Sequence, residues 1–326
     1  MKKARKLPIE MLASYLLATL VTTQKSSPSL AQLDAATSGR LGAFVTDGKR
    51  VVASRPDERF SLQSVMKLVA AMAAFDAIDR GKLSLATKFT VGYEDMSMSH
   101  QPLAARVGPG KTTVVTVREL IELAVQQSDS MAVDVLVDKL GGIGVVQSFL
   151  RRKGITGVRV DRTERILQCE TVGVKWKPSF RVEGVYDKEV AAMSPKARTA
   201  AQKRYMADPR DTATPRGFGY LLVKLATGKL LSKSSTEELL KVMEGTQTYP
   251  ERLANSVPAP WKFGHKTGSS GTWNGMAVAT NDVGIARDDS GRFVVIVCFL
   301  GDAKGDMDAR NATIAKVPGA SGLFGR

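Results

Sequence analysis

Apolar runs separated by polar and glycine-rich stretches divide the chain into strand-like and helix-like segments. The segment Gly42–Ala53 holds two β-prone runs around an Asp-Gly turn, which predicts a hairpin. The run Leu68–Phe75 is rich in alanine and has no helix breaker, so it predicts a buried helix that begins at Ser64 and ends near Arg80-Gly81. Further helices are expected over Leu30–Thr37, Thr116–Gln127, Met131–Leu140, Ile143–Lys153, Pro195–Met206, Pro215–Ala226, Ser235–Gly245 and Asp306–Ala315.

Strand-like patterns return only near the end of the chain, at Trp261–His265, Trp273–Thr280 and Arg292–Leu300. Residues 82–115 and most of 158–215 are polar and punctuated by glycine and proline, which predicts irregular structure there. Two early strands, at least three late strands and helices between them indicate an α+β fold, an α/β sandwich. We expect an antiparallel sheet formed from both chain ends, with an all-helical subdomain inserted at about 61–215.

The composition is that of an ordinary globular protein of 326 residues, without repeats or low-complexity tracts. We expect a single domain over residues 32–326. Two cysteines, Cys169 and Cys298, permit one disulfide, but nothing in the sequence brings them together and free thiols are expected. The only histidines are His100 and His265, so few ligands are available for a metal site and few bases for a Ser-His-Asp triad. No cofactor is expected.

The N-terminus carries four basic residues and then the apolar run Met11–Val21, which is too short to span a bilayer. This pattern predicts a signal peptide over residues 1–25, with a cleavage site up to residue 31, and export to the periplasm or medium without stable membrane insertion. The formal net charge is +15. In an exported protein we interpret this charge as a basic solvated face or an affinity for anionic envelope surfaces, not as a nucleic-acid interface.

Candidate chemistry begins with Ser64 and Lys67, which are three residues apart and therefore lie on one face of the predicted helix. An amine placed there can accept the proton of a serine hydroxyl, and a helix N-terminus favours a developing alkoxide. The S-x-x-K pair is common by chance. Two further short motifs follow it, Ser128-Asp129-Ser130 between two helices and Lys266-Thr267-Gly268, with Ser269 and Ser270 behind it, on a strand.

In this order and placement the three motifs resemble those of class A β-lactamases and penicillin-binding proteins. The resemblance to class A β-lactamases covers nearly the whole chain after the predicted signal. It includes Arg55–Phe60 before the nucleophile, Thr116–Leu120 before the second motif, and Asp161–Glu164 and Asp208–Pro215 at the two ends of an Ω-loop. The last two stretches are far more specific than S-x-x-K.

The resemblance implies a role for each matched residue. Ser64 attacks the lactam carbonyl, Lys67 accepts its proton or stabilises it, and Ser128 with Lys266 delivers a proton to the leaving nitrogen. Glu164 activates the water that releases the acyl group. Backbone N–H groups of Ser64 and Ser269 form the oxyanion hole, and Arg162 pairs with Asp211 across the neck of the loop. Substrate-binding positions are Ser130, Gln168, Thr267, Gly268 and Ser269. The implied partner is a small β-lactam, and the chain is expected to act as a monomer.

Several positions depart from the family pattern. Ser130 and Gln168 each stand where the family has asparagine, Arg165 replaces a proline, and the family's aromatic residue at the rim is missing near Ser99-His100. Residues 169–207 form an insertion that lengthens the Ω-loop, with Trp176, Phe180 and Tyr186 expected to pack it down.

These departures keep two alternatives open: a D-alanyl-D-alanine carboxypeptidase acting on peptidoglycan, and a non-hydrolytic β-lactam sensor. Three further residues have expected roles outside the reaction. His265 is expected to be a packing residue, Asp129 to be structural, and Glu170 to serve as base only if the loop shifts its register.

Overall fold

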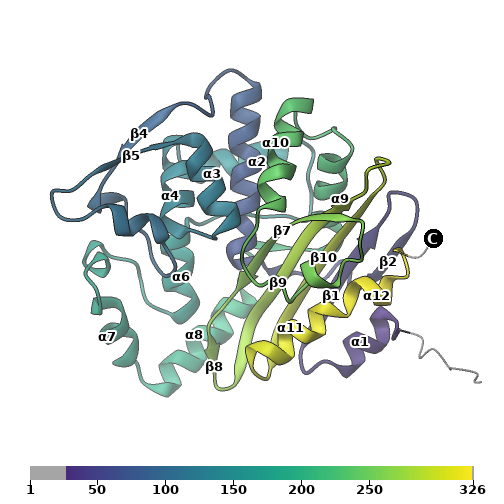
Figure 1. The fold of residues 1–326 in the computed structure, drawn as a ribbon. Helices are drawn as coiled ribbons and strands as arrows, with labels where there is room; N and C mark the ends of the chain where they lie inside the picture. Colours follow the sequence, from purple (N-terminus) through teal and green to yellow (C-terminus); the bar gives the residue numbers. More distant parts are fainter. Residues whose placement is uncertain (1–26, 325–326) are drawn as a thin grey trace, which may run out of the picture.

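The computed structural model describes residues 27–324, so the predicted signal peptide (residues 1–25) lies outside the described residues. A six-stranded antiparallel sheet runs through one half of the molecule, and helices fill the other half (Figure 1). The strand order is β2-β1-β10-β9-β7, with β8 paired to β9. The strands are β1 (Arg40–Thr46), β2 (Val51–Ser54), β7 (Lys262–Ser269), β8 (Thr272–Trp273), β9 (Met276–Arg287) and β10 (Phe293–Lys304).

The central pairing of the sheet joins the two ends of the chain, because β1 lies antiparallel to β10. Val294 to Leu300 are all buried, as expected for an apolar strand covered on both faces. One face packs against α1 (Leu30–Ala36), α11 (Met307–Ala315) and α12 (Val317–Ser321). The other face packs against α9 (Pro215–Ala226) and α10 (Lys233–Glu244). The predicted α+β architecture is therefore confirmed.

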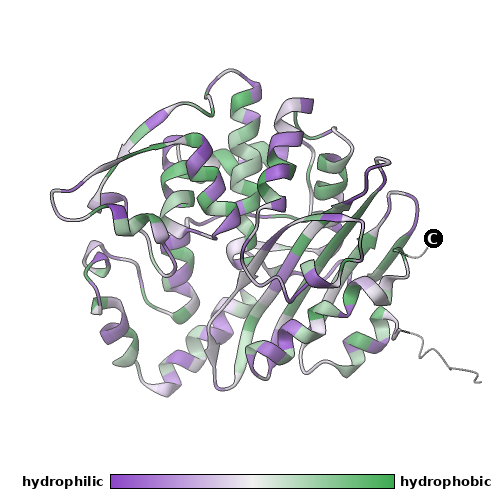
Figure 2. Cartoon of the chain, viewed as in Figure 1, coloured by the Kyte–Doolittle hydropathy of each residue, from purple (hydrophilic) through white to green (hydrophobic). Residues whose placement is uncertain are grey.

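The helical half is built around α2 (Met66–Asp79), whose residues from Met66 to Ala77 are all buried. A helix that is apolar on every side must be enclosed by others, and its alanines let the neighbours approach closely. Those neighbours are α3 (Val117–Gln126), α4 (Ser130–Lys139), α5 (Gly144–Arg152) and α10. Figure 2 shows the resulting concentration of apolar residues in α2 and in the central strands. A single turn of 3-10 helix, η1 (Gln63–Val65), leads into α2.

The prediction of irregular structure over 82–115 was wrong in part. Strand β4 (Lys88–Val91) pairs with β5 (Thr113–Thr116), and two short 3-10 helices lie between them, η2 (Tyr93–Asp95) and η3 (Pro102–Arg106). Sequence patterns identify hairpins with tight turns, whereas a connection this long gives no such signal. One further 3-10 turn, η5 (Ala254–Ser256), precedes β7.

The prediction for 158–215 was also incomplete. Beyond the expected helix, now α8 (Pro195–Ala207), this stretch contains α6 (Glu164–Val172), η4 (Pro178–Arg181) and α7 (Val185–Ala191). Strand β6 (Thr212–Ala213) pairs with β3 (Phe60–Ser61) and so joins the end of this stretch to the segment before Ser64. Helix α6 was not predicted because it is short and because its start depends on contacts with residues remote in sequence.

The insertion, residues 169–207, forms its own small apolar cluster. Trp176, Phe180 and Tyr186 pack with Cys169 and Met98, and the Phe180 and Tyr186 rings meet edge to face. This arrangement confirms that the aromatic residues pack the insertion down. Cys169 lies in this cluster and Cys298 in the sheet, and both are buried free thiols, as expected. Within residues 27–324, no helix has the length and apolarity that a membrane crossing requires.

Candidate active site

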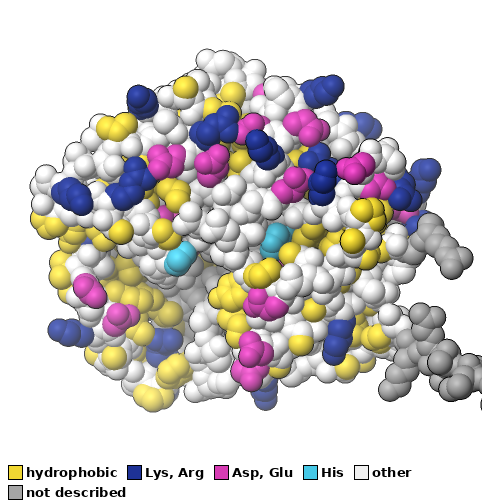
Figure 3. Space-filling view, viewed as in Figure 1, with side chains coloured by type: hydrophobic (Ala, Val, Ile, Leu, Met, Phe, Trp, Pro, Cys, Tyr) yellow, Lys and Arg dark blue, Asp and Glu magenta, His cyan; other side chains and the backbone are white. Residues whose placement is uncertain are grey.

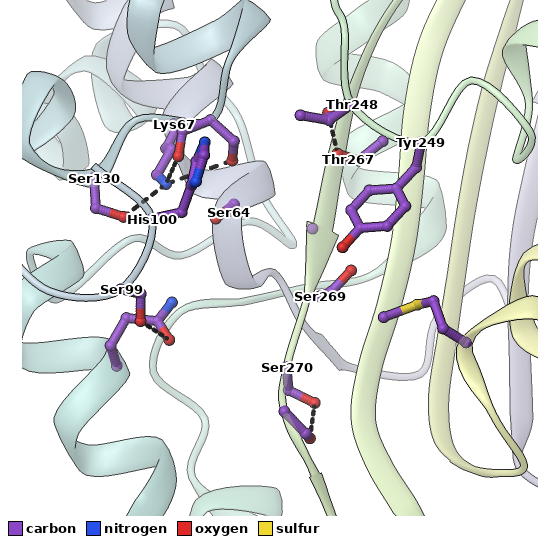
Figure 4. Close-up of a pocket in the computed structure, with 15 residues that line it drawn as sticks. Ser64, Lys67, Ser99, His100, Ser130, Thr248, Tyr249, Thr267, Ser269 and Ser270 are labelled. Atoms are coloured by element: carbon purple, nitrogen blue, oxygen red, sulfur yellow. Dashed lines mark hydrogen bonds between the residues drawn. The ribbon is translucent and has the colours of Figure 1, made fainter. Parts of the chain in front are cut away.

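A cleft of about 510 Å³ lies between the helical half and strand β7. Figure 3 shows that the surface is hollowed between these two halves, with acidic and basic side chains scattered over the same face. Side chains from the end of η1, the start of α2 and the α3–α4 junction form one wall, and those of β7 form the other (Figure 4). The cleft is lined by Ser64, Lys67, Ser99, His100, Ser128, Ser130, Gln168, Thr248, Tyr249, Thr267, Gly268, Ser269, Ser270, Gly271 and Met307.

At the floor of the cleft, the Ser64 hydroxyl and the Lys67 amine both contact the carboxylate of Glu164. The Ser64 hydroxyl donates to Glu164 Oε1 at 3.1 Å, and Lys67 Nζ lies 3.2 Å from the same oxygen. The Lys67 and Glu164 side chains are 1% and 0% exposed. The Ser64 hydroxyl therefore has a carboxylate within hydrogen-bond reach that can take its proton, and Lys67 contacts the same carboxylate oxygen.

The Glu164 carboxylate is held ionised by its surroundings. Burial raises the pKa of Glu164, but the Lys67 charge and hydrogen bonds from Gln168, Lys67 and Ser64 outweigh burial, and the net pKa is lowered. Gln168 Nε2 donates to the second oxygen, Oε2, at 2.9 Å. Because its ordinary form at neutral pH is the anion, Glu164 is able to act as a proton acceptor.

The backbone of Glu164 is fixed by Asp134, a residue that the sequence analysis missed. Asp134 is buried on α4 and accepts from the Glu164 N–H at 2.7 Å and from the Arg165 N–H at 3.0 Å. It thereby satisfies two of the four N–H groups that the start of α6 leaves free. Arg165 Nε also donates to Asp134, at 3.0 Å, so the arginine in place of proline contributes to this anchor.

Ser128 occupies the opposite side of the floor, between two lysines. Lys266 Nζ donates to Ser128 Oγ at 2.9 Å, and Lys67 Nζ donates to the Ser128 carbonyl at 2.6 Å and to Ser130 Oγ at 3.1 Å. Burial and the neighbouring Lys67 charge lower the pKa of Lys266 well below its ordinary value. A hydroxyl beside a lysine of lowered pKa is suited to passing a proton onward.

The far wall of the cleft is the end of β7, where Thr267, Gly268 and Ser269 face the cavity. Thr248 and Thr267 share a hydroxyl hydrogen bond of 2.6 Å. A Cβ at Gly268 would lie 2.7 Å from the Leu62 carbonyl, so only glycine lets β7 approach the segment before Ser64 this closely.

Behind this wall lies Arg252, a fully buried arginine that the sequence analysis also missed. Its Nη2 donates to Ser269 Oγ at 2.8 Å, and its Nη1 donates to the Asn281 carbonyl at 2.9 Å. Burial lowers the pKa of Arg252, but a guanidinium remains charged at neutral pH. The ring of Tyr249, at the rim, lies 4.0 Å from the guanidinium. No sequence motif predicts this arginine, because it lies in a loop before β7 and is brought behind the cleft wall only by folding.

Arg162 and Asp211 form an ion pair at the neck of the loop, away from the cleft. Asp211 also accepts from the Asp161 N–H at 2.7 Å and the Arg162 N–H at 3.0 Å, which ties both ends of the loop together. Arg162 Nη1 donates to Glu170 at 2.7 Å. Glu170 is therefore paired with Arg162 at the neck of the loop and does not line the cleft. This position argues against Glu170 as an alternative base.

Other residues singled out in the sequence have structural roles. His265 Nδ1 lies 2.9 Å from Asp282, and its ring stacks on Phe263, so it packs behind the sheet edge as expected. Asp129 accepts from the Ala132 and Leu103 N–H groups, which confirms its structural role at the helix junction. Within the described range 27–324, the acidic, histidine and cysteine side chains form no group suited to a metal ion.

A family model described as the beta-lactamase enzyme family matches residues 25–320. The chain belongs to this family. The beta-lactamase VEB-1 of Pseudomonas aeruginosa is 27% identical over 287 residues, which are 86% of this chain and 84% of that protein. The extended-spectrum beta-lactamase PER-1 of Pseudomonas aeruginosa is 28% identical over 262 residues, which are 80% of this chain and 74% of that protein.

Solved structures of β-lactamases have the same fold. An ancestral class A β-lactamase of Gram-negative bacteria superposes with a TM-score of 0.70 at 32% identity, covering 89% of this chain and 96% of that one. A β-lactamase from Chitinophaga pinensis superposes with a TM-score of 0.72 at 27% identity, covering 89% and 95%. The class A resemblance and the serine hydrolase class expected from the sequence are thereby confirmed.

Proposed function

We propose that this protein hydrolyses the β-lactam amide of penicillin- and cephalosporin-type compounds through an acyl-enzyme on Ser64. The proposal rests above all on one observation: the Ser64 hydroxyl and the Lys67 amine both contact the Glu164 carboxylate at the floor of the cleft. Acyl transfer needs a nucleophile and a base, and release of the acyl group needs a second activated nucleophile. The three side chains supply all of these functions.

Acylation begins when Ser64 Oγ attacks the lactam carbonyl carbon and gives up its proton. Glu164 accepts a hydrogen bond from this hydroxyl and can take its proton, and Lys67, which contacts the same carboxylate oxygen, is the alternative acceptor. The negative charge that develops on the carbonyl oxygen is stabilised by the Ser64 and Ser269 backbone N–H groups; losing one such donor typically costs roughly 10²–10³ in rate. When the C–N bond breaks, Ser128 gives its proton to the nitrogen and Lys266 favours that transfer.

Deacylation uses water in place of the serine. Glu164 accepts a proton from a water that attacks the ester carbon, and the Ser64 oxygen leaves and regains its proton. Gln168 takes the place of the family's asparagine and donates to Glu164 Oε2, so its amide orients the carboxylate.

The β7 wall would bind the anionic end of the substrate. The hydroxyls of Thr267 and Ser269 face the cleft, and the Arg252 charge lies directly behind Ser269. A substrate carboxylate at this position would gain charge-assisted hydrogen bonds, which are the stronger kind. Ser130 and Gln168 line the cleft away from β7, and we expect the amide side chain of the substrate to lie against them.

We infer that the protein acts outside the cytoplasm, as a monomer, and confers resistance to β-lactam antibiotics. Support comes from the predicted signal peptide and from the beta-lactamase family to which the chain belongs. A D-alanyl-D-alanine carboxypeptidase or a non-hydrolytic sensor would share Ser64 and Lys67, but neither has a use for a buried carboxylate bonded to the nucleophile.

Incubation of the protein lacking residues 1–25 with a chromogenic cephalosporin separates the three functions. We expect sustained colour formation that is lost in Ser64→Ala, with any transient mass adduct located on Ser64. A long-lived adduct without turnover would instead favour the carboxypeptidase or the sensor. Neither adduct nor turnover would exclude every acylating function.

A further inference from the structure

The segment that carries the nucleophile is held in a strained backbone conformation. We call residues 61–65 the nucleophile turn. Gln63, directly before Ser64, has φ of +47°, in the left-handed region that residues other than glycine rarely adopt. Such a conformation persists only where the surroundings impose it. The backbone of Gln63 sets the plane of the Gln63–Ser64 peptide, and hence the direction of the Ser64 N–H.

The backbone of the nucleophile turn is held from two sides. Asn281 on β9 donates to the Ser61 carbonyl at 2.8 Å and to the Leu62 carbonyl at 3.1 Å, and the Leu62 N–H donates to the Asp211 carbonyl at 2.9 Å. These contacts fix the residues before Gln63 but none of them reaches the Gln63 side chain.

The Gln63 side chain is held by the insertion. It is fully buried, and its Nε2 donates to Tyr205 Oη at 2.8 Å and more weakly to Ser61 Oγ at 3.3 Å. Tyr205 Oη lies 2.9 Å from Ser61 Oγ, so the three groups form a closed triangle beneath the nucleophile turn. Gln63 Oε1 bonds to none of the described residues, which leaves Tyr205 as the shortest polar contact of the amide.

Tyr205 is itself rigidly placed. It lies on α8, which runs beside β8 at the edge of the sheet (Figure 1). The Trp273 indole donates to Thr199 Oγ1 at 3.2 Å and Gln202 Nε2 donates to the Met276 carbonyl at 3.4 Å, so α8 is fastened to the β8–β9 edge. The Arg162 guanidinium lies 5.3 Å from the Tyr205 ring centroid, on the side of the loop neck.

We propose that Tyr205 is a positioning residue for acylation: its hydroxyl fixes the Gln63 amide, and through it the backbone that aims the Ser64 N–H and Oγ into the cleft. The insertion is thus part of the support of the nucleophile. This inference rests on the proposed acylation of Ser64. It assigns a function to the insertion through a residue that does not line the cleft.

The test is the variant Tyr205→Phe, which removes the hydroxyl but keeps the ring and its packing. In an acyl-enzyme mechanism kcat/KM reports the steps through acylation. An amide without its partner favours other conformations of the nucleophile turn, in which the Ser64 N–H is misdirected, so we expect kcat/KM for a chromogenic cephalosporin to fall roughly tenfold. Tyr186→Phe is the matched control, because Tyr186 lies in the same insertion and its hydroxyl bonds to no other described residue. We expect its kcat/KM to be unchanged.

The variant Gln63→Gly separates positioning from a general loss of structure. Glycine adopts positive φ without strain and has no amide to hold. In that background Tyr205→Phe should lower kcat/KM by less than twofold, although the thermal midpoint can still fall. An equal loss of kcat/KM in both backgrounds, or no loss in the single variant, would overturn the inference. Failure of the unmutated protein to acylate would instead count against the proposed function itself.

Discussion

Replacing Arg252 by glutamine removes a buried positive charge from behind the wall that we expect to bind the substrate carboxylate. Arg252 Nη2 lies 2.8 Å from Ser269 Oγ. A carboxylate oxygen that accepts a hydrogen bond from this hydroxyl would lie about 2.7 Å further on. The charge and the carboxylate are then about 5 Å apart, with one hydroxyl between them.

The size of the effect follows from that separation. Two unit charges about 5 Å apart attract by about 3 kcal/mol at an effective dielectric constant of about 20. The cleft is open to solvent, which screens part of this attraction, so we expect about 1.5–3 kcal/mol. Since about 1.4 kcal/mol is a factor of ten, Arg252→Gln should lower kcat/KM between about tenfold and about 140-fold, mainly through a higher KM.

The assay compares a penicillin that has a free carboxylate with the methyl ester of the same compound. Arg252 also bonds the Asn281 and Gly268 carbonyls, so the variant loses some stability, but that loss affects both substrates alike. We expect the preference for the free acid over the ester to fall by the factor given above. If kcat/KM falls equally for acid and ester, the charge does not act on the carboxylate and the reasoning is refuted.

Three further predictions concern the floor of the cleft. The pKa values of Glu164 and Lys266 are both lowered. In a plot of kcat/KM against pH, the acidic limb should therefore lie below the ordinary pKa of glutamate, and the basic limb below the ordinary pKa of lysine. Limbs at the ordinary values would contradict these environments. Asp134→Ala leaves the N–H groups at the start of α6 unpaired and should lower the free energy of unfolding by about 2–4 kcal/mol in a urea unfolding assay. Asp138→Ala, at a half-exposed position, should lower it by about 1 kcal/mol or less. Equal losses in the two variants would refute the anchoring role of Asp134. Gln168→Ala should slow deacylation more than acylation in single-turnover kinetics, because the amide contacts Glu164 Oε2; a larger loss in acylation would count against that role.

The sign of the linked stability follows from the lowered pKa of Glu164. The carboxylate contributes its full stability above its ordinary pKa of 4.5, and this contribution is lost as the pH falls through the lower folded value. For Lys266 the sign is reversed, because a buried lysine of lowered pKa destabilises the fold when it is charged. Stability should therefore recover as the pH rises towards the ordinary lysine range.

The sequence predicts the fold well where hydrophobic patterns are strong. The apolar run of β10 and the alanine-rich run of α2 are each long and unbroken, and the pairing of early with late strands follows from their order. Local pattern fails where the structure depends on remote partners. Helix α6 begins where Asp134 accepts its first N–H groups, and β4 meets β5 across a long connection.

The same division holds for the site. Ser64 and Lys67 share a helix face, so their spacing places them together without further information. Arg252 and Tyr205 reach the nucleophile region from a loop and from the insertion, and no local pattern marks either of them. Their positions depend on the packing of α8 and of the segment before β7, which only the three-dimensional arrangement provides.

The central claim is that Glu164 releases the acyl group from Ser64, and the time course of protein mass after mixing with a penicillin tests it most directly. We expect the unmutated protein to return to its unmodified mass once the penicillin is consumed. Glu164→Ala should instead retain one acyl group on Ser64 for at least about 100 times longer. If Glu164→Ala loses its adduct as fast as the unmutated protein, the carboxylate bonded to the nucleophile is not the group that activates water.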